Sequence, residues 1–81
     1  MTMMDLKHLE YLDEIAHEAW AGNYERTGVL SSGERRYVAL ASGRMRELVP
    51  DDSIAWAVDR VGPEAMKHML QVFGHSDQPK N

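Results

Sequence analysis

The chain has 81 residues and no cysteine. This excludes disulfide bonds, and it excludes zinc sites built from thiolates. It also has no apolar run long enough for the core of a signal peptide or for a membrane-spanning helix, which needs about 20 residues. Small secreted domains usually depend on disulfides for their stability, so these absences predict a cytoplasmic protein that does not enter membranes.

Motifs for catalysis and cofactor binding are also missing. The sequence contains neither Gly-x-Ser-x-Gly nor His-Glu-x-x-His, and it has no glycine-rich loop of the kind that binds phosphates. Glu14 and His17 have the Glu-x-x-His spacing of di-iron helical bundles, but such sites need a second copy of the motif and further carboxylates. We therefore expect a protein that is not an enzyme and that binds no metal and no cofactor.

The length fits one domain with one hydrophobic core. A chain of this size buries only about 60–65% of the surface that its unfolded state exposes, so extra stability from a second copy, as a homodimer, is expected. We expect residues 1–74 to form a single helical domain. Residues 75–81 contain no apolar side chain and are expected to form a disordered tail.

The net charge is −4, and it is unevenly distributed along the chain. Residues 1–22 carry five acidic side chains against one lysine, whereas residues 23–50 carry five arginines against three glutamates. Nonspecific binding to nucleic acid depends mostly on neutralising phosphates, so the negative total disfavours a nucleic-acid partner. The basic middle segment still permits a local contact with an anion or with a protein.

Apolar residues recur at steps of three and four, which is typical of amphipathic helices that share a core. The pattern predicts helices at about residues 4–20, 32–48, 53–61 and 63–73. Ser31 and Glu34 have the spacing of a capping box, and Gly62-Pro63 separates the last two helices. The predicted fold class is therefore all-α, a small bundle of about four helices.

The same pattern predicts which side chains face the core. Trp20, Ile54 and Leu70 fall on the apolar sides of their helices, and Val29 is expected to point inward from the loop after the first helix. Gly43 lies inside the second predicted helix, where it costs roughly 1 kcal/mol relative to alanine. Its position there suggests a close approach between two helices.

A β-hairpin is an alternative structure for residues 27–40. Ser32-Gly33 is a common turn pair, and the neighbouring Tyr37 and Val38 favour strands. The alternative fold class is accordingly α+β with one short hairpin.

Residues 53–73 have the outline of a helix-turn-helix, which gives an alternative function. Recognition helices usually bring basic or amide side chains to the bases within a positive surround. The second helix here offers Glu64, Lys67, His68 and Gln71, with almost no net charge. A small nucleic-acid-binding regulator is therefore the alternative and not the leading hypothesis.

The candidates for binding a protein partner are Arg35, Arg36, Arg44, Arg46 and Trp56. The arginines concentrate in one predicted helix, where they either pair with the acidic face of residues 4–20 or form an exposed contact patch, because arginine is enriched in interface hot spots. The tryptophan lies off the apolar stripe of its helix, so a second copy of the chain could cover it.

The stretch Thr27–Ala41, with Ser53-Ile54-Ala55 and Val61-Gly62-Pro63-Glu64, resembles small uncharacterised proteins of bacteriophages and integrated elements. The likeness covers about half of the chain and includes no catalytic or ligand motif, so it assigns no residue a role. It implies a bacterial or phage origin, where short acidic proteins often occlude a host machine, as anti-CRISPR proteins do. The expected function is a small non-catalytic protein-binding module, an inhibitor or host-takeover factor that acts on a bacterial protein complex.

Overall fold

A computed structural model describes residues 5–74 of the chain. The elements in order are α1 (Leu6–Trp20), the 3-10 helix η1 (Glu25–Val29), α2 (Ser32–Ser42), α3 (Met45–Leu48), α4 (Ile54–Val61) and α5 (Pro63–Phe73). The predicted all-α fold is confirmed. The hairpin alternative is wrong, because residues 27–40 are helical apart from a short connection. The tail expected at residues 75–81 lies outside the described residues.

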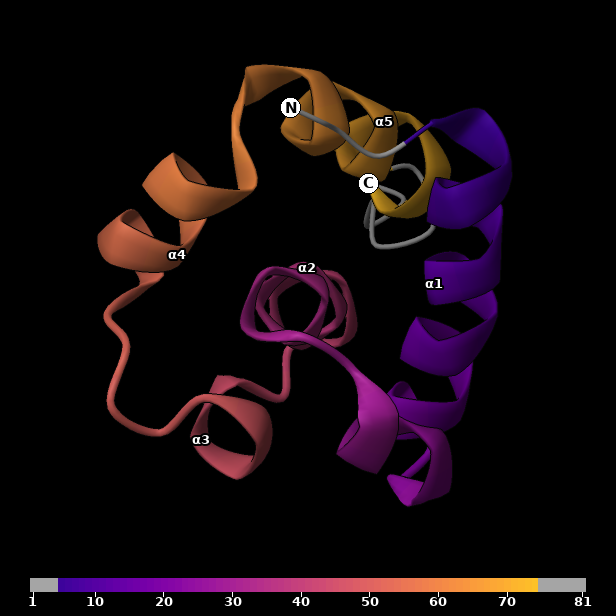
Figure 1. The fold of residues 1–81 in the computed structure, drawn as a ribbon, viewed down its shortest axis with the longest axis vertical. Coiled ribbons are helices and arrows are strands. Elements are labelled where there is room, and N and C mark those ends of the chain that lie inside the picture. Colours follow the sequence, from indigo (N-terminus) through magenta and orange to yellow (C-terminus); the bar gives the residue numbers. More distant parts are fainter. Residues whose placement is uncertain (1–4, 75–81) are drawn as a thin grey trace, which may run out of the picture.

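The central element is α2, which contacts α1, α3, α4 and α5. Figure 1 shows α2 end-on, with these helices arranged around it. Its consecutive residues Tyr37, Val38 and Ala39 are all buried, which requires cover on more than one side. Leu12 and Ile15 of α1 are also fully buried. No helix within residues 5–74 has the length and apolar character that a membrane crossing requires.

The starts of the helices follow local capping rules. The Ser31 hydroxyl accepts from the backbone N–H of Glu34 at 3.2 Å, and the Glu34 carboxylate accepts from the backbone N–H of Ser31 at 2.8 Å. The capping box predicted at the start of α2 is therefore present. The side chains of Asp5 and Ser53 cap α1 and α4, and Pro63 opens α5.

The helix predicted over residues 32–48 is in fact two helices that meet at Gly43. This residue ends α2 with a φ of +73°, and α3 begins after it at Met45. A left-handed residue with a Cβ costs about 1–2 kcal/mol, which glycine avoids. A Cβ at Gly43 would meet no atom within 4 Å, so the glycine serves the turn and not a close approach of helices. The expectation of an interior helical glycine is therefore wrong.

The apolar side chains that were expected in the core but are exposed include Trp20, Val29, Ile54 and Leu70. Three of them are at the first or last position of their element, where the neighbouring helices no longer give cover. Leu70 lies next to the buried Met69, about 100° further around α5. The periodicity identifies the apolar side of a helix, but not how far the neighbouring helix extends along it.

Candidate protein-binding surface

Two of the arginines predicted to bind a partner are occupied inside the fold. Arg36 donates from Nε to Oδ2 of Asp52 at 2.6 Å, in the segment before α4. Arg35 donates from Nη2 to the carbonyl oxygens of Thr27 and Leu30 at 3.3 and 3.4 Å. Both guanidinium groups therefore fasten neighbouring segments to α2.

Arg44 and Arg46 lie at the other end of α2, around the turn into α3. Arg44 donates from Nε to the carbonyl oxygen of Ala19 at 3.1 Å and from Nη2 to that of Trp20 at 2.6 Å. A positive charge at this place also complements the negative end of the α1 dipole. The side chain of Arg46 is exposed. Arg44 thus positions the end of α1, whereas Arg46 presents its charge to the solvent.

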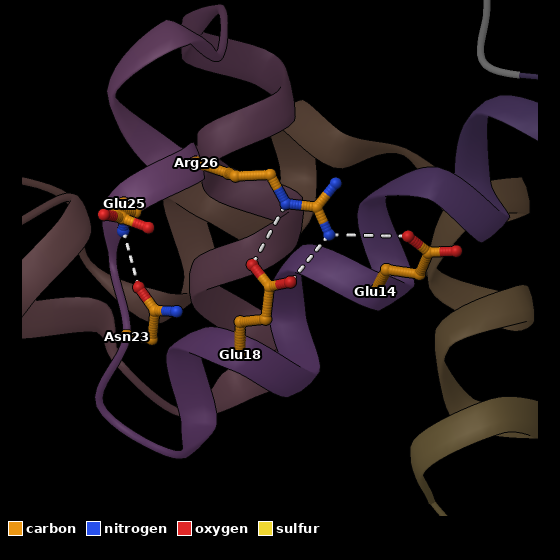
Figure 2. A network of polar contacts seen from close by, with 5 residues as sticks. All are labelled: Glu14, Glu18, Asn23, Glu25 and Arg26. Carbon is orange, nitrogen blue, oxygen red and sulfur yellow. Dashed lines mark hydrogen bonds and ion pairs between the residues drawn. The ribbon is translucent and has the colours of Figure 1, made fainter.

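The acidic face of α1 is instead paired with Arg26 of η1. This guanidinium donates to both carboxylate oxygens of Glu18, at 3.1 and 2.7 Å, and to Glu14 at 3.4 Å (Figure 2). Hydrogen bonding between the two charged groups lowers the pKa of Glu18 and raises the pKa of Arg26. The pairing that was considered for the arginines of residues 35–46 is therefore made by Arg26 of η1.

Glu14 and His17, which have the spacing of a di-iron motif, take part in separate contacts. Glu14 pairs with Arg26, and the ring of His17 lies 5.0 Å from the ring of Phe73, measured between centroids. Within residues 5–74, no group of three or more His, Cys, Asp or Glu side chains could hold a metal ion. The His17 contact connects α1 with the end of α5.

Two hollows lie side by side at the C-terminal end of α2. The first has a volume of about 350 Å³ and is lined by His17, Trp20, Leu40, Ala41, Ser42, Gly43 and Phe73. The second has a volume of about 400 Å³ and is lined by Leu40, Gly43, Arg44, Met45, Arg46, Glu47 and Ile54. Because Leu40 and Gly43 line both, we treat the two hollows as one feature and call it the α2-end surface. Their volumes fall within the range of about 300–1,000 Å³ that is typical of binding pockets.

Trp20 is the largest side chain on the α2-end surface, and 68% of it is exposed. It lies one helical turn beyond His17, which contacts the end of α5 at Phe73. Because α5 ends at Phe73, no helix of residues 5–74 covers Trp20. An exposed tryptophan beside a hollow is typical of an interface hot spot. Sequence reasoning missed Trp20, because its place in the apolar stripe assigned it to the core.

Trp56 lies on α4 and lines neither hollow. Its side chain is 45% exposed, and the guanidinium of Arg60 lies 4.1 Å from the centre of a Trp56 ring. Such a cation–π contact is worth about 0.5–1 kcal/mol at an exposed site. Of the five predicted residues, the structure therefore brings only Arg44 and Arg46 together on one surface.

A buried polar cluster joins α1, α2 and α5. The Asp13 carboxylate, 8% exposed, accepts from the Tyr37 hydroxyl at 2.8 Å, and its other oxygen lies 2.8 Å from Nε2 of His68. Burial raises the pKa of Tyr37, and the neighbouring carboxylate adds to this effect. None of the three side chains lines the α2-end surface. The cluster joins α1, α2 and α5, which are also the helices whose residues line the first hollow.

The corner between α4 and α5 has some features of a helix-turn-helix. Only Gly62, with a φ of +92°, separates the two helices, whereas a helix-turn-helix has a turn of three or four residues. The exposed side chains of α5 include Glu64, Lys67 and Gln71. This mixture supplies little positive charge for contacts with phosphates.

Comparison of the chain with protein-family models, with curated proteins and with solved structures finds no match. The resemblance to phage proteins thus stays an expectation. The support for a function comes from the geometry, in which the α2-end surface combines an exposed tryptophan, two hollows and an exposed arginine.

Proposed function

We propose that this chain is a small non-catalytic protein-binding module and that the α2-end surface is its binding site. The observation that carries the proposal is the exposed Trp20 at a hollow that is also lined by Leu40 and Phe73. Covering this apolar surface with a partner side chain is favourable by about 25 cal/mol per Å² of apolar area. Tryptophan also has little conformational freedom to lose on binding, which favours its use as an anchor.

The proposed partner is a bacterial protein complex, and the chain would act on it as a phage-encoded inhibitor or host-takeover factor. The resemblance of residues 27–41 to small phage proteins supports this part of the proposal. A module without catalytic groups can inhibit by covering a surface that another protein needs. The lack of cysteine agrees with action in the reducing cytoplasm.

We also propose a homodimer that forms through Trp56. The exposed part of this ring lies on α4, outside the α2-end surface, so a second copy could cover it without blocking the hollows. A two-fold dimer would place the same patch of both copies in contact.

Affinity capture from a bacterial lysate tests the binding site, with the wild type, Trp20→Ala and Val29→Ala as baits. Both substituted side chains are exposed, so the thermal midpoints of the two variants should be close to that of the wild type. Val29 ends η1, at the other end of α2, and serves as the matched control. We expect the wild type and Val29→Ala to capture proteins that Trp20→Ala does not. The substitution at Trp20 should weaken the free energy of binding by about 2 kcal/mol or more. Equal retention by all three baits would place the binding site elsewhere.

Gel retardation of DNA tests the alternative of a nucleic-acid-binding regulator. Three of the four arginines in residues 35–46 are hydrogen-bonded within the fold, and the net charge is −4. We therefore expect no retardation at physiological salt. Retardation that weakens steeply with added salt would favour the nucleic-acid-binding regulator over the protein-binding module.

A further inference from the structure

We propose that the partner segment that binds the α2-end surface is an acidic peptide, with apolar side chains that enter the two hollows and a carboxylate that pairs with Arg46. This inference rests on the proposed function, because it requires that the α2-end surface binds protein. It adds the chemistry of the partner.

The shape of the surface suits a continuous peptide with two apolar anchors. The hollows have volumes of about 350 and 400 Å³, and they adjoin along Leu40 and Gly43. Gly43 has no side chain, and a Cβ at this position would meet no atom within 4 Å. A peptide backbone can therefore cross from one hollow to the other close to the end of α2. Trp20 borders the first hollow and Ile54 the second, and both are exposed apolar side chains.

The charges of the lining favour an acidic segment. The second hollow is lined by Arg44 and Arg46 against the single Glu47, and His17 is the one titratable residue that lines the first. The surface is thus locally positive on a protein whose net charge is −4. A segment with negative charge is attracted to this region and repelled by much of the remaining surface.

Arg46 is the cation that is left to pair with the partner. Arg44 already donates to the carbonyl oxygens at the end of α1. Among the ion pairs within residues 5–74, none involves Arg46, although it is exposed beside the second hollow. An arginine can bind a carboxylate through two parallel hydrogen bonds, which fixes the orientation of the bound group.

The acidic face of α1 gives a weaker case for a basic partner. Glu14 and Glu18 are paired with Arg26, so their charges are partly neutralised within the protein. Neither glutamate lines one of the two hollows.

The experiment is selection of binders from a display library of short random peptides with the full chain as target. We expect the selected peptides to combine large apolar residues with Asp or Glu. Each selected peptide is then synthesised in a second form, with lysine in place of its acidic residues. This exchange should weaken binding to the wild type by about tenfold or more, and Arg46→Glu should restore part of the affinity for the lysine form. Arg60→Glu on α4 is the matched charge reversal and should restore none.

A second measurement locates the bound peptide. The chain has two tryptophans, so two indole N–H signals report on the two surfaces in an NMR titration with the selected peptides. We expect the Trp20 signal to shift and the Trp56 signal to stay. If Trp20 shifts but the peptides are basic or indifferent to the lysine exchange, the acidic-peptide inference is wrong and the proposed function stands. If no peptide is selected, or if only Trp56 shifts, both the inference and the proposed binding site are wrong.

Discussion

The carboxylate of Asp13 in α1 accepts a hydrogen bond of 2.8 Å from the hydroxyl of Tyr37 in α2, and both side chains are buried. The other carboxylate oxygen lies 2.8 Å from the His68 ring of α5. A buried carboxylate is costly unless several donors surround it, and the donors here come from two other helices. The Asp13 carboxylate keeps both partners only when α1, α2 and α5 hold their relative positions. The cluster therefore stabilises this arrangement of the three helices.

Tyr37→Phe should lower the free energy of unfolding by about 1.5–3 kcal/mol, because the ring stays in place and only the hydrogen bond to the carboxylate is lost. In a domain of this size, each kcal/mol corresponds to a fall in Tm of about 4–8 °C. Unfolding in urea measures the change. The control is Tyr11→Phe at an exposed position, which should change stability by less than about 0.5 kcal/mol. Equal effects of the two substitutions would show that the Asp13 bond contributes nothing.

The raised pKa of Tyr37 predicts a loss of stability at alkaline pH. The folded state holds the hydroxyl proton more tightly than the unfolded chain, in which the pKa is about 10. The resulting stabilisation is complete below about pH 10 and decreases above it, by up to about 1.4 kcal/mol per pH unit. Urea unfolding of the wild type and Tyr37→Phe across this range tests the prediction. The wild type should lose stability more steeply, and parallel curves would contradict the assignment to Tyr37.

Gly43→Ala should lower the free energy of unfolding by about 1–2 kcal/mol, because its φ of +73° disfavours any residue with a Cβ. Gly43→Asn should cost less, since asparagine adopts the left-handed region more readily. Gly28→Ala is the matched control, because Gly28 has no positive φ and an added Cβ there also meets no atom within 4 Å. Thermal and urea unfolding provide the comparison. A loss as large at Gly28 as at Gly43 would remove backbone conformation as the cause.

The proposed dimer predicts that Trp56→Ala shifts the protein toward the monomer. Sedimentation of the wild type at micromolar concentration should give twice the chain mass of 9.2 kDa, and its thermal midpoint should rise with protein concentration. Trp56→Ala should lose this concentration dependence. Trp20→Ala is the control and should remain dimeric, because Trp20 belongs to the α2-end surface. A monomeric wild type would exclude the dimer and leave Trp56 available to a different partner.

The ends of most helices could be predicted from the sequence, because their causes act within a few residues. Ser31 and Glu34 form their capping box across three positions, and Gly62-Pro63 ends one helix and starts the next. Gly43 was misassigned because a glycine late in a helical pattern fits both the interior of a helix and its left-handed end. The choice depends on tertiary packing, since the turn at Gly43 redirects the chain so that Leu48 of α3 reaches the core.

The candidate site could be predicted only in part. The concentration of arginine in the sequence identified Arg44 and Arg46, which do line the α2-end surface. The exposure of Trp20 depends on where α5 ends, and the periodicity of α1 contains no information about that. The contact between Asp13 and His68 spans 55 residues, so no spacing within one helix reports it. Long-range contacts of this kind are set by how the helices pack.

The central position of α2 also determines how the protein comes apart. The helices α1, α3, α4 and α5, which contact α2, also provide its cover (Figure 1). These helices pack on one core, so the loss of any one of them exposes part of it. We therefore expect unfolding to be cooperative across the domain. The backbone amide hydrogens of α2 should exchange with solvent only when the whole domain unfolds. Those at the ends of the outer helices should exchange through local fraying.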